Sequence, residues 1–147
     1  MSEAQKARNT DALRVFLSYA AADKPYADRV RSVLSRRANL RIFTTESLSA
    51  GEDWASRLKD ELSRCQLFVV VLSPSSVESN WILHELGAAW GLNKPIIPIV
   101  TDPEVISKVP LTLRGIKFVG VKELEKPEVV SQLLERYQDL VPSHKGR

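Results

Sequence analysis

Gln66-Leu-Phe-Val-Val-Val-Leu72 contains the longest uninterrupted apolar run of the chain, and this run has the length of one β-strand. Its residues do not alternate between apolar and polar, as they do in a strand with one face in water. A short run that is apolar throughout is typical of a parallel strand with both faces covered. This stretch therefore predicts an α/β protein built on a parallel sheet.

Segments of strand and helix character alternate on both sides of this run. The predicted strands are 14–19, 40–44, 66–72, 95–100 and 116–121, and helices begin near Asp23 (as N-cap), Trp54, Trp81 and Pro127. Because no segment repeats, this alternation predicts a doubly wound five-stranded parallel sheet. The prolines of the fourth strand place it near a sheet edge, or are confined to the strand ends. Ligands bind such sheets outside the carboxyl ends of the strands.

The composition is that of an ordinary globular protein, with 44% hydrophobic and 27% charged residues among 147. This length fits one domain, which we place at residues 13–141, between a flexible leader (1–12) and a polar tail (142–147). No apolar run is long enough to span a membrane, and the leader has no apolar core of a secretion signal. The single cysteine suits a reducing compartment, so we expect a cytoplasmic protein.

The net charge of +3 is too small to indicate a nucleic-acid partner. Five arginines do gather in a stretch without acidic residues, at positions 29, 31, 36, 37 and 41. We interpret this stretch as the solvated face of the first helix and the turn after it. A basic stripe that faces an acidic stripe on a second copy of the chain is the alternative. We expect neither nucleic acid nor a membrane as a partner.

The common phosphate-binding and metal-binding motifs (Gly-x-Gly-x-x-Gly, the Walker loop and His-x-x-x-His) do not occur in the sequence. We therefore predict no metal site. Glu85 is the strongest candidate functional residue, because it lies early in the helix that follows the most apolar strand. Trp81 precedes it by four residues, which places both side chains on one helix face near the expected ligand crevice. The alternative is a solvated glutamate beside a tryptophan that packs on the loop.

Four segments of the chain, in the same order and spacing, resemble the motifs of Toll/interleukin-1 receptor (TIR) domains. Together they make the resemblance far more specific than any one motif, and it extends over about residues 14–141. The variant looks most like the bacterial TIR domains that cleave NAD. The segments are Phe-Leu-Ser-Tyr (16–19) with Asp23, Ser-Leu-Ser-Ala-Gly-Glu-Asp-Trp (47–54), Leu-Ser-Pro (72–74) with Ser-Asn-Trp-Ile-Leu-His-Glu-Leu (79–86), and Lys-Pro-Ile-Ile-Pro-Ile (94–99).

This resemblance implies a flavodoxin-like fold with a pocket under the loop after the second strand, called the BB loop (44–53). It implies that Glu85, the glutamate of the Trp-x-x-x-Glu motif, is catalytic. It also implies that NAD is contacted by Ala20, Ala21, Ser49, Trp54 and Trp81. Some enzymatic relatives carry arginines after the Ser-Tyr pair, which could meet the diphosphate, whereas this chain has three alanines at 20–22. Its diphosphate contacts must therefore come from elsewhere.

The function implied is that of an NAD+ glycohydrolase or ADP-ribosyl cyclase, with NAD+ as substrate and no cofactor. The reaction gives nicotinamide with ADP-ribose or a cyclic isomer. One carboxylate suffices for it, because nicotinamide leaves as a neutral molecule and needs no general acid. The resemblance further implies self-association through the BB loop and a role in bacterial immune (anti-phage) signalling. The alternatives are a non-enzymatic TIR–TIR interaction module and a virulence effector acting on host TIR signalling.

Overall fold

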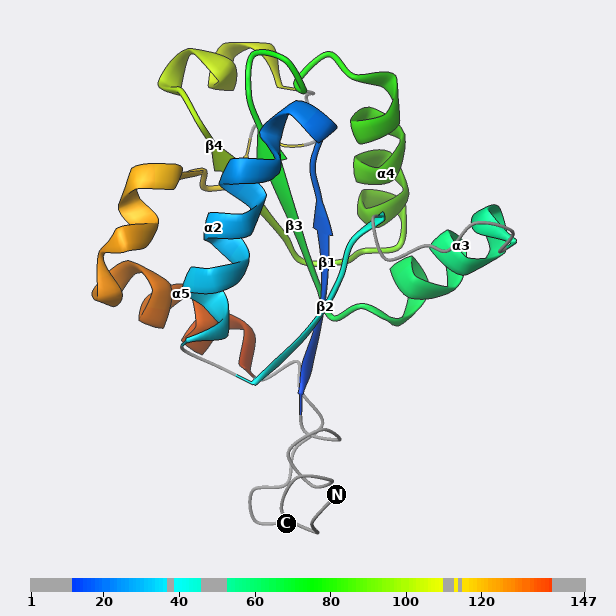
Figure 1. Cartoon of the computed structure of the whole chain (residues 1–147), viewed down its shortest axis with the longest axis horizontal. Helices are drawn as coiled ribbons and strands as arrows, with labels where there is room; N and C mark the ends of the chain where they lie inside the picture. Colours follow the sequence, from blue (N-terminus) through cyan, green and yellow to red (C-terminus); the bar gives the residue numbers. More distant parts are fainter. Residues whose placement is uncertain (1–11, 37–38, 46–52, 110–112, 114, 139–147) are drawn as a thin grey trace, which may run out of the picture.

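The computed structural model describes residues 12–36, 39–45, 53–109, 113 and 115–138. Its core is a five-stranded, all-parallel sheet in the order β2-β1-β3-β4-β5 (Figure 1), which confirms the predicted fold class. Residues 1–11 of the predicted leader (1–12) and the tail 142–147 lie outside the described residues, whereas Ala12, the last residue of that leader, is buried. The strands are β1 (Leu13–Ser18), β2 (Leu40–Phe43), β3 (Leu67–Leu72), β4 (Ile96–Val100) and β5 (Val119–Gly120).

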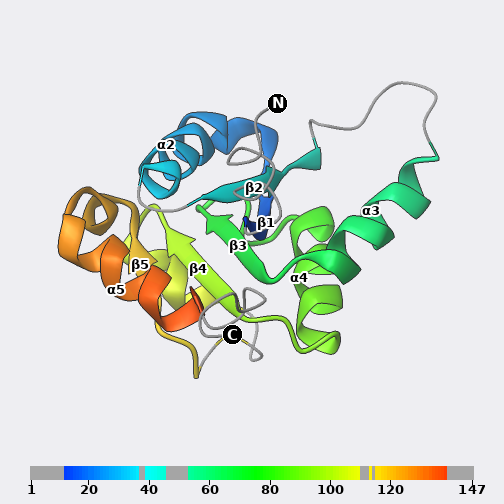
Figure 2. The same ribbon diagram turned by 90° about the horizontal axis from the view of Figure 1, so that it is seen from below.

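Helices cover both faces of this sheet. The α-helices are α2 (Lys24–Ser35), α3 (Trp54–Arg64), α4 (Asn80–Gly91) and α5 (Pro127–Gln138). The short 3-10 helices are η1 (Ala21–Asp23), η3 (Pro103–Lys108) and η5 (Val121–Glu125). Figure 2 shows α2 and α5 on one side of the sheet and α3 and α4 on the other. The molecule therefore has three layers, as expected of a doubly wound fold.

The apolar run of β3 is buried on both faces, which explains why it does not alternate. Leu67, Val69 and Val71 pack into the core shared with α2 and α5. Phe68 and Val70 point the other way, into the core shared with α3 and α4. Since successive strand residues point to opposite faces, a strand between two helical layers is apolar at every position.

The helices α3 and α4 begin close to the predicted positions because side chains cap them. Asp53 accepts a hydrogen bond from the backbone N–H of Ser56 at 3.3 Å, at the start of α3. Ser79 accepts one from the N–H of Ile82 at 3.4 Å, at the start of α4. Such caps satisfy N–H groups that have no partner within the helix.

The last strand is shorter than predicted, with two residues in place of the six of 116–121. Only Val119 and Gly120 pair with β4. The chain turns into η5 directly afterwards, because the Glu123 carboxylate accepts a hydrogen bond from the Gly120 N–H at 2.9 Å. A local side-chain contact therefore ends the strand, although the apolar pattern continues to Val121.

Pro98 lies inside β4, which is not an edge strand. The N–H of Thr101 donates to Leu72 in β3. Since N–H groups of a parallel strand point alternately to its two neighbours, the nitrogen of Pro98 faces the β5 side. The pairing of β5 with β4 begins only at Ile99. The proline is therefore accommodated where no ladder hydrogen bond is required of it.

Candidate functional site

The strand order reverses between β1 and β3, which lie side by side in the centre of the sheet. From β1 the chain continues to α2 on one face, and from β3 it continues to α4 on the other (Figure 1). Because the two connections leave in opposite directions, the carboxyl ends of these strands form the topological switch point, where doubly wound proteins bind ligands. Ser18 ends β1, and Ser73 directly follows β3.

Glu85 reaches this switch point from the second turn of α4. Its side chain is only 1% exposed. The Ser18 hydroxyl donates a hydrogen bond of 2.6 Å to Oε1 of Glu85. The other oxygen, Oε2, is buried and has no hydrogen-bond partner among the described residues. The carboxyl group is thus held by one oxygen and has a free acceptor on the other, which is costly in a buried place and is common at functional sites.

Burial changes the acidity of this carboxyl. Loss of contact with water raises the pKa of Glu85 to about 7, and the hydrogen bond from Ser18 opposes this rise. At neutral pH the protonated and ionised forms are therefore both present. A carboxyl with such a perturbed pKa at a topological switch point is a candidate for catalysis. The predicted alternative of a solvated glutamate is wrong, because this side chain is buried.

A second buried polar cluster lies beside the first, around the loop after β3. The Ser73 hydroxyl donates to Oδ2 of Asp23 at 2.7 Å, and the Ser73 N–H donates to the Ser76 hydroxyl at 2.8 Å. The Ser76 hydroxyl in turn donates to the carbonyl of Val71 at 3.2 Å. Asp23 does precede α2, but its side chain makes no capping hydrogen bond there. Instead it ties the turn after β1 to the loop after β3.

The structure describes some of the other predicted site residues and not all of them. Trp81 is half-buried one turn before Glu85 and packs against the α3–α4 core. Ala20 is half-buried and Ala21 is exposed, in the turn after β1. Trp54 is the first residue of α3, and its side chain is not described. Ser49 lies outside the described residues, as does most of the BB loop.

Ser18 and Ser73 make hydrogen bonds in the site that the sequence did not predict. Ser18 was part of the Phe-Leu-Ser-Tyr motif, and Ser73 was part of Leu-Ser-Pro. The signal was a polar residue at the end of an apolar run, since an unpaired hydroxyl is unfavourable in a buried strand. No cluster of metal-ligating side chains occurs among the described residues. None of the helices in the described ranges is long and apolar enough to cross a membrane.

A comparison of the chain with known protein families identifies its family. The family model described as the TIR domain matches residues 15–134, which is most of the chain. The chain belongs to the TIR domain family. Its Trp81 and Glu85 are the two residues that the resemblance had singled out within the Trp-x-x-x-Glu motif.

Solved structures with the same fold include other TIR domains. The TIR domain of the Toll-related receptor TRR-2 from Hydra magnipapillata is 24% identical with a TM-score of 0.66, over 86% of this chain and 96% of that chain. A TIR-STING receptor from C. gigas is 23% identical with a TM-score of 0.62, over 80% of this chain and 40% of that chain. At these identities the similarity shows the shared fold alone.

A further solved structure with a similar fold is described as an enzyme and not as a TIR domain. The 2-desoxiribosyltransferase from Leishmania mexicana is 16% identical with a TM-score of 0.61, over 85% of this chain and 98% of that chain. A search of curated protein sequences gave no significant match. The comparisons therefore establish the family and the fold, while the chemistry has to be argued from the site.

Proposed function

We propose that this TIR domain cleaves the bond between nicotinamide and ribose in NAD+, with Glu85 as the catalytic carboxylate. The observation that supports this proposal is the Glu85 carboxyl itself, which is buried at the switch point with one oxygen bound by Ser18 and the other unpartnered. The products are nicotinamide and either ADP-ribose or a cyclic ADP-ribose isomer. The Leishmania deoxyribosyltransferase shows that this fold is compatible with chemistry on a sugar, which is a fold-level analogy only.

The reaction needs one carboxylate and no acid partner. Nicotinamide is a cation in NAD+, so it takes the electrons of the C–N bond and leaves neutral. The ribose carbon becomes electron-poor in the transition state, and an ionised Glu85 stabilises this charge inside a site with little water. Water then adds to the carbon and releases a proton, which gives ADP-ribose. If a group of the same molecule adds instead, the product is cyclic.

The site must open for this to happen. Glu85 is 1% exposed, so ribose hydroxyls reach Oε2 only after the surrounding segments move. We propose that contact between TIR domains, through the BB loop, brings about this opening. Activity then depends on the concentration of the domain. The cellular role we propose, bacterial immune signalling, rests on the family resemblance alone.

The second candidate function is a non-enzymatic TIR–TIR interaction module, including one that acts on host TIR signalling. The burial of Glu85 favours it, because in this arrangement the carboxyl is shielded from solvent and holds β1 against α4 through Ser18. In this case Glu85 is structural and the BB loop is an assembly surface.

The test is incubation of the purified chain with NAD+ at low and at high protein concentration, with nicotinamide and ADP-ribose species separated by chromatography. We expect nicotinamide release that rises faster than linearly with protein concentration and is lost in Glu85→Gln. Glu78→Gln is the matched control, because Glu78 is exposed in the loop before α4. Circular dichroism checks that both variants remain folded. No release at concentrations where the domain self-associates, or full release by Glu85→Gln, would overturn the proposal.

A further inference from the structure

Two buried hydrogen bonds join the same two parts of the chain across the switch point. In the first, Ser18 at the end of β1 donates to Glu85 in α4, the helix after β3. In the second, Ser73 at the end of β3 donates to Asp23, which directly precedes α2, the helix after β1. Each strand end is therefore bonded to the carboxyl group that follows the other strand, and the two bonds form a crossed pair.

Most of the buried polar side chains in the described part of the chain belong to these two contacts or to the loop beside them. Asp23 and Ser73 are each 4% exposed. A buried donor or acceptor that loses its partner has to reach water, because an unpaired polar group is unfavourable in the interior. Breaking either bond therefore requires the two connections to separate. The buried polar or charged residues described are Ser18, Asp23, Thr44, Ser73, Ser76 and Glu85.

The bond between Ser73 and Asp23 is connected to α4 through the loop after β3. The Ser76 N–H donates to the Ser73 hydroxyl at 3.1 Å, and the Ser73 N–H donates to the Ser76 hydroxyl at 2.8 Å. The Ser79 N–H donates to the carbonyl of Ser76 at 2.9 Å, and Ser79 caps α4. A continuous series of hydrogen bonds thus runs from Asp23 to the helix that carries Glu85.

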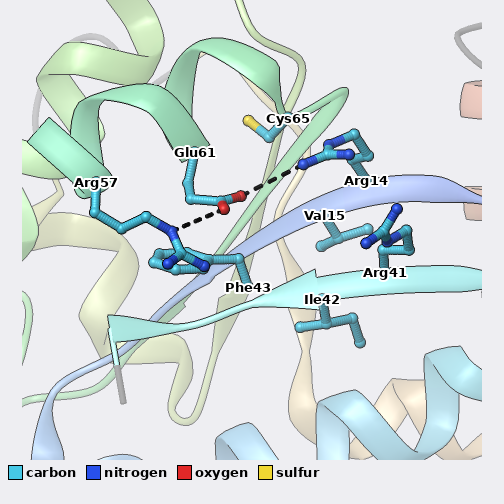
Figure 3. A pocket seen from close by; sticks show the side chains of 8 residues that line it. All are labelled: Arg14, Val15, Arg41, Ile42, Phe43, Arg57, Glu61 and Cys65. Atoms are coloured by element: carbon cyan, nitrogen blue, oxygen red, sulfur yellow. Dashed lines mark hydrogen bonds and ion pairs between the residues drawn. The ribbon is translucent and has the colours of Figure 1, made fainter. Parts of the chain in front are cut away.

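The cavity shown in Figure 3 gives no access to Glu85. It has a volume of about 180 Å³ and lies at the β2 edge of the sheet, between β1, β2 and α3. Arg14 and Arg41, which are partners in the pairing of β1 with β2, line it, whereas Ser18 and Glu85 do not. Arg14 precedes Ser18 by four residues, which is roughly 13 Å along a strand. A ligand therefore reaches Glu85 only when the connections above it part.

Of the two bonds, the one between Ser73 and Asp23 is the better suited to break. The Ser73 hydroxyl has a second acceptor within reach, because the Ser76 hydroxyl oxygen lies 3.3 Å away. The side chain of Asp23 makes no capping hydrogen bond to α2, so its release does not uncap that helix. The bond from Ser18, in contrast, holds the carboxyl of Glu85 itself.

We propose that the hydrogen bond from Ser73 to Asp23 is the closure of the Glu85 site, and that it breaks when the site admits a ligand. Ser73 and Asp23 are then positioning residues, which set the balance between a closed and an open arrangement of the two connections. The effect of this closure on activity rests on the proposed NAD+ cleavage, whereas the closure itself does not.

The experiment is labelling of solvent-accessible carboxyl groups with glycine ethyl ester and a water-soluble carbodiimide at a single pH, followed at each residue by mass spectrometry. In the parent chain we expect Glu85 to react far more slowly than the exposed Glu78. Ser73→Ala should speed the labelling of Glu85 about 10-fold or more, as expected for the loss of a hydrogen bond to a carboxylate. The rate at Glu78 should stay the same. Ser75→Ala, at an exposed serine of the same loop, should change the Glu85 rate less than about twofold.

Two further comparisons separate local opening from general loss of stability. Val130 is fully buried in α5, in the core shared with α2, so Val130→Ala destabilises the fold without touching the contact between Ser73 and Asp23. It should not speed the labelling of Glu85. Asp23→Ala should act like Ser73→Ala, and the double variant should label no faster than the single ones, because both substitutions remove the same bond.

Nicotinamide release gives a second readout. Ser73→Ala should release nicotinamide from NAD+ at protein concentrations that are too low for the parent chain. Faster labelling of Glu85 without release by any variant supports the closure and contradicts NAD+ cleavage. Unchanged labelling in Ser73→Ala, or an equal increase in Val130→Ala, overturns the closure even where the parent chain cleaves NAD+.

Discussion

The hydroxyl of Ser18 lies 2.6 Å from Oε1 of Glu85 and joins the last residue of β1 to a helix residue 67 positions later. This contact leaves Oε2 of Glu85 as a buried acceptor with no partner among the described residues. It also favours the ionised carboxylate against the effect of burial. One serine therefore both orients the candidate catalytic group and partly offsets the effect of burial on its charge.

The first prediction is that Ser18→Ala lowers the rate of nicotinamide release at pH 7 by about 10-fold or more, since a hydrogen bond to a charged group contributes about this much. Without the donor, the pKa of Glu85 rises further, so less of the carboxyl is ionised. The acidic limb of the kcat/KM profile, which reports the free protein, should move to higher pH.

The pH profile separates this role from a merely structural one. Activity of Ser18→Ala should recover as the pH is raised, because the carboxylate then ionises without help. Ser18→Thr keeps the hydroxyl and should retain a profile close to that of the parent chain. A uniform loss of rate at every pH would show that Ser18 supports the fold and not the charge of Glu85.

The second prediction concerns stability against pH. The pKa of Glu85 is about 7 in the folded chain and 4.5 in the unfolded chain. Between these pH values the Glu85 carboxyl is protonated more in the folded state than in the unfolded state. Its contribution to the free energy of unfolding therefore falls as the pH rises from about 4.5 to about 7, and is then level. The full difference corresponds to about 3 kcal/mol.

Glu85→Gln has no titrating group at this position, so it should lack this loss. We expect the free energy of unfolding of the variant, relative to that of the parent chain, to increase by about 3 kcal/mol between pH 4.5 and pH 8. Urea unfolding of both proteins at several pH values measures it, and other titrating groups cancel in the difference. A difference that does not change with pH would mean that Glu85 titrates as in water.

The third prediction concerns the contact between Ser73 and Asp23. Ser73→Ala removes the donor to a buried carboxylate oxygen, and should lower the free energy of unfolding by about 1–3 kcal/mol. Ser75→Ala changes an exposed serine of the same loop and should have an effect within about 0.5 kcal/mol. Urea unfolding measures the free energy of unfolding of both variants. Equal effects would show that the hydrogen bond from Ser73 to Asp23 does not stabilise the fold.

The fourth prediction concerns the single cysteine. Cys65 is 4% exposed, and burial raises the pKa of its thiol. Since the thiolate is the reactive form, iodoacetamide should alkylate the native chain far more slowly than the urea-unfolded chain. Mass spectrometry follows the modification. Rapid stoichiometric labelling of the native protein would contradict the packing of Cys65 between α3 and β3.

Much of the fold could be predicted from local pattern. The run from Leu67 to Leu72 predicted a strand buried on both faces, and both faces are buried. The alternation of strands and helices predicted the doubly wound sheet. The pattern overestimated β5 at both ends, since the strand begins only at Val119. At Gly120 the side chain of Glu123 turns the chain, and such a contact leaves no trace in the apolar periodicity.

The site could be predicted only in part. The position of Glu85 after the most buried strand placed it near the expected ligand crevice, and the family resemblance implied its catalytic role. Its burial and perturbed pKa agree with that hypothesis without testing it. Its partner could not be predicted, because Ser18 is distant in the sequence and hydroxyls are common. For the same reason Asp23 was interpreted as a helix cap, whereas it accepts from Ser73 across the switch point.

The sequence by itself determined which segments become strands and helices, and which family the motifs resemble, because periodicity and motif spacing are local properties of the chain. Only the tertiary structure decided which side chains share an environment. The order β2-β1-β3 brings Ser18 to Glu85 and places Arg14 beside Arg41. Contacts of this kind depend on register and on desolvation, which arise only when distant segments pack together.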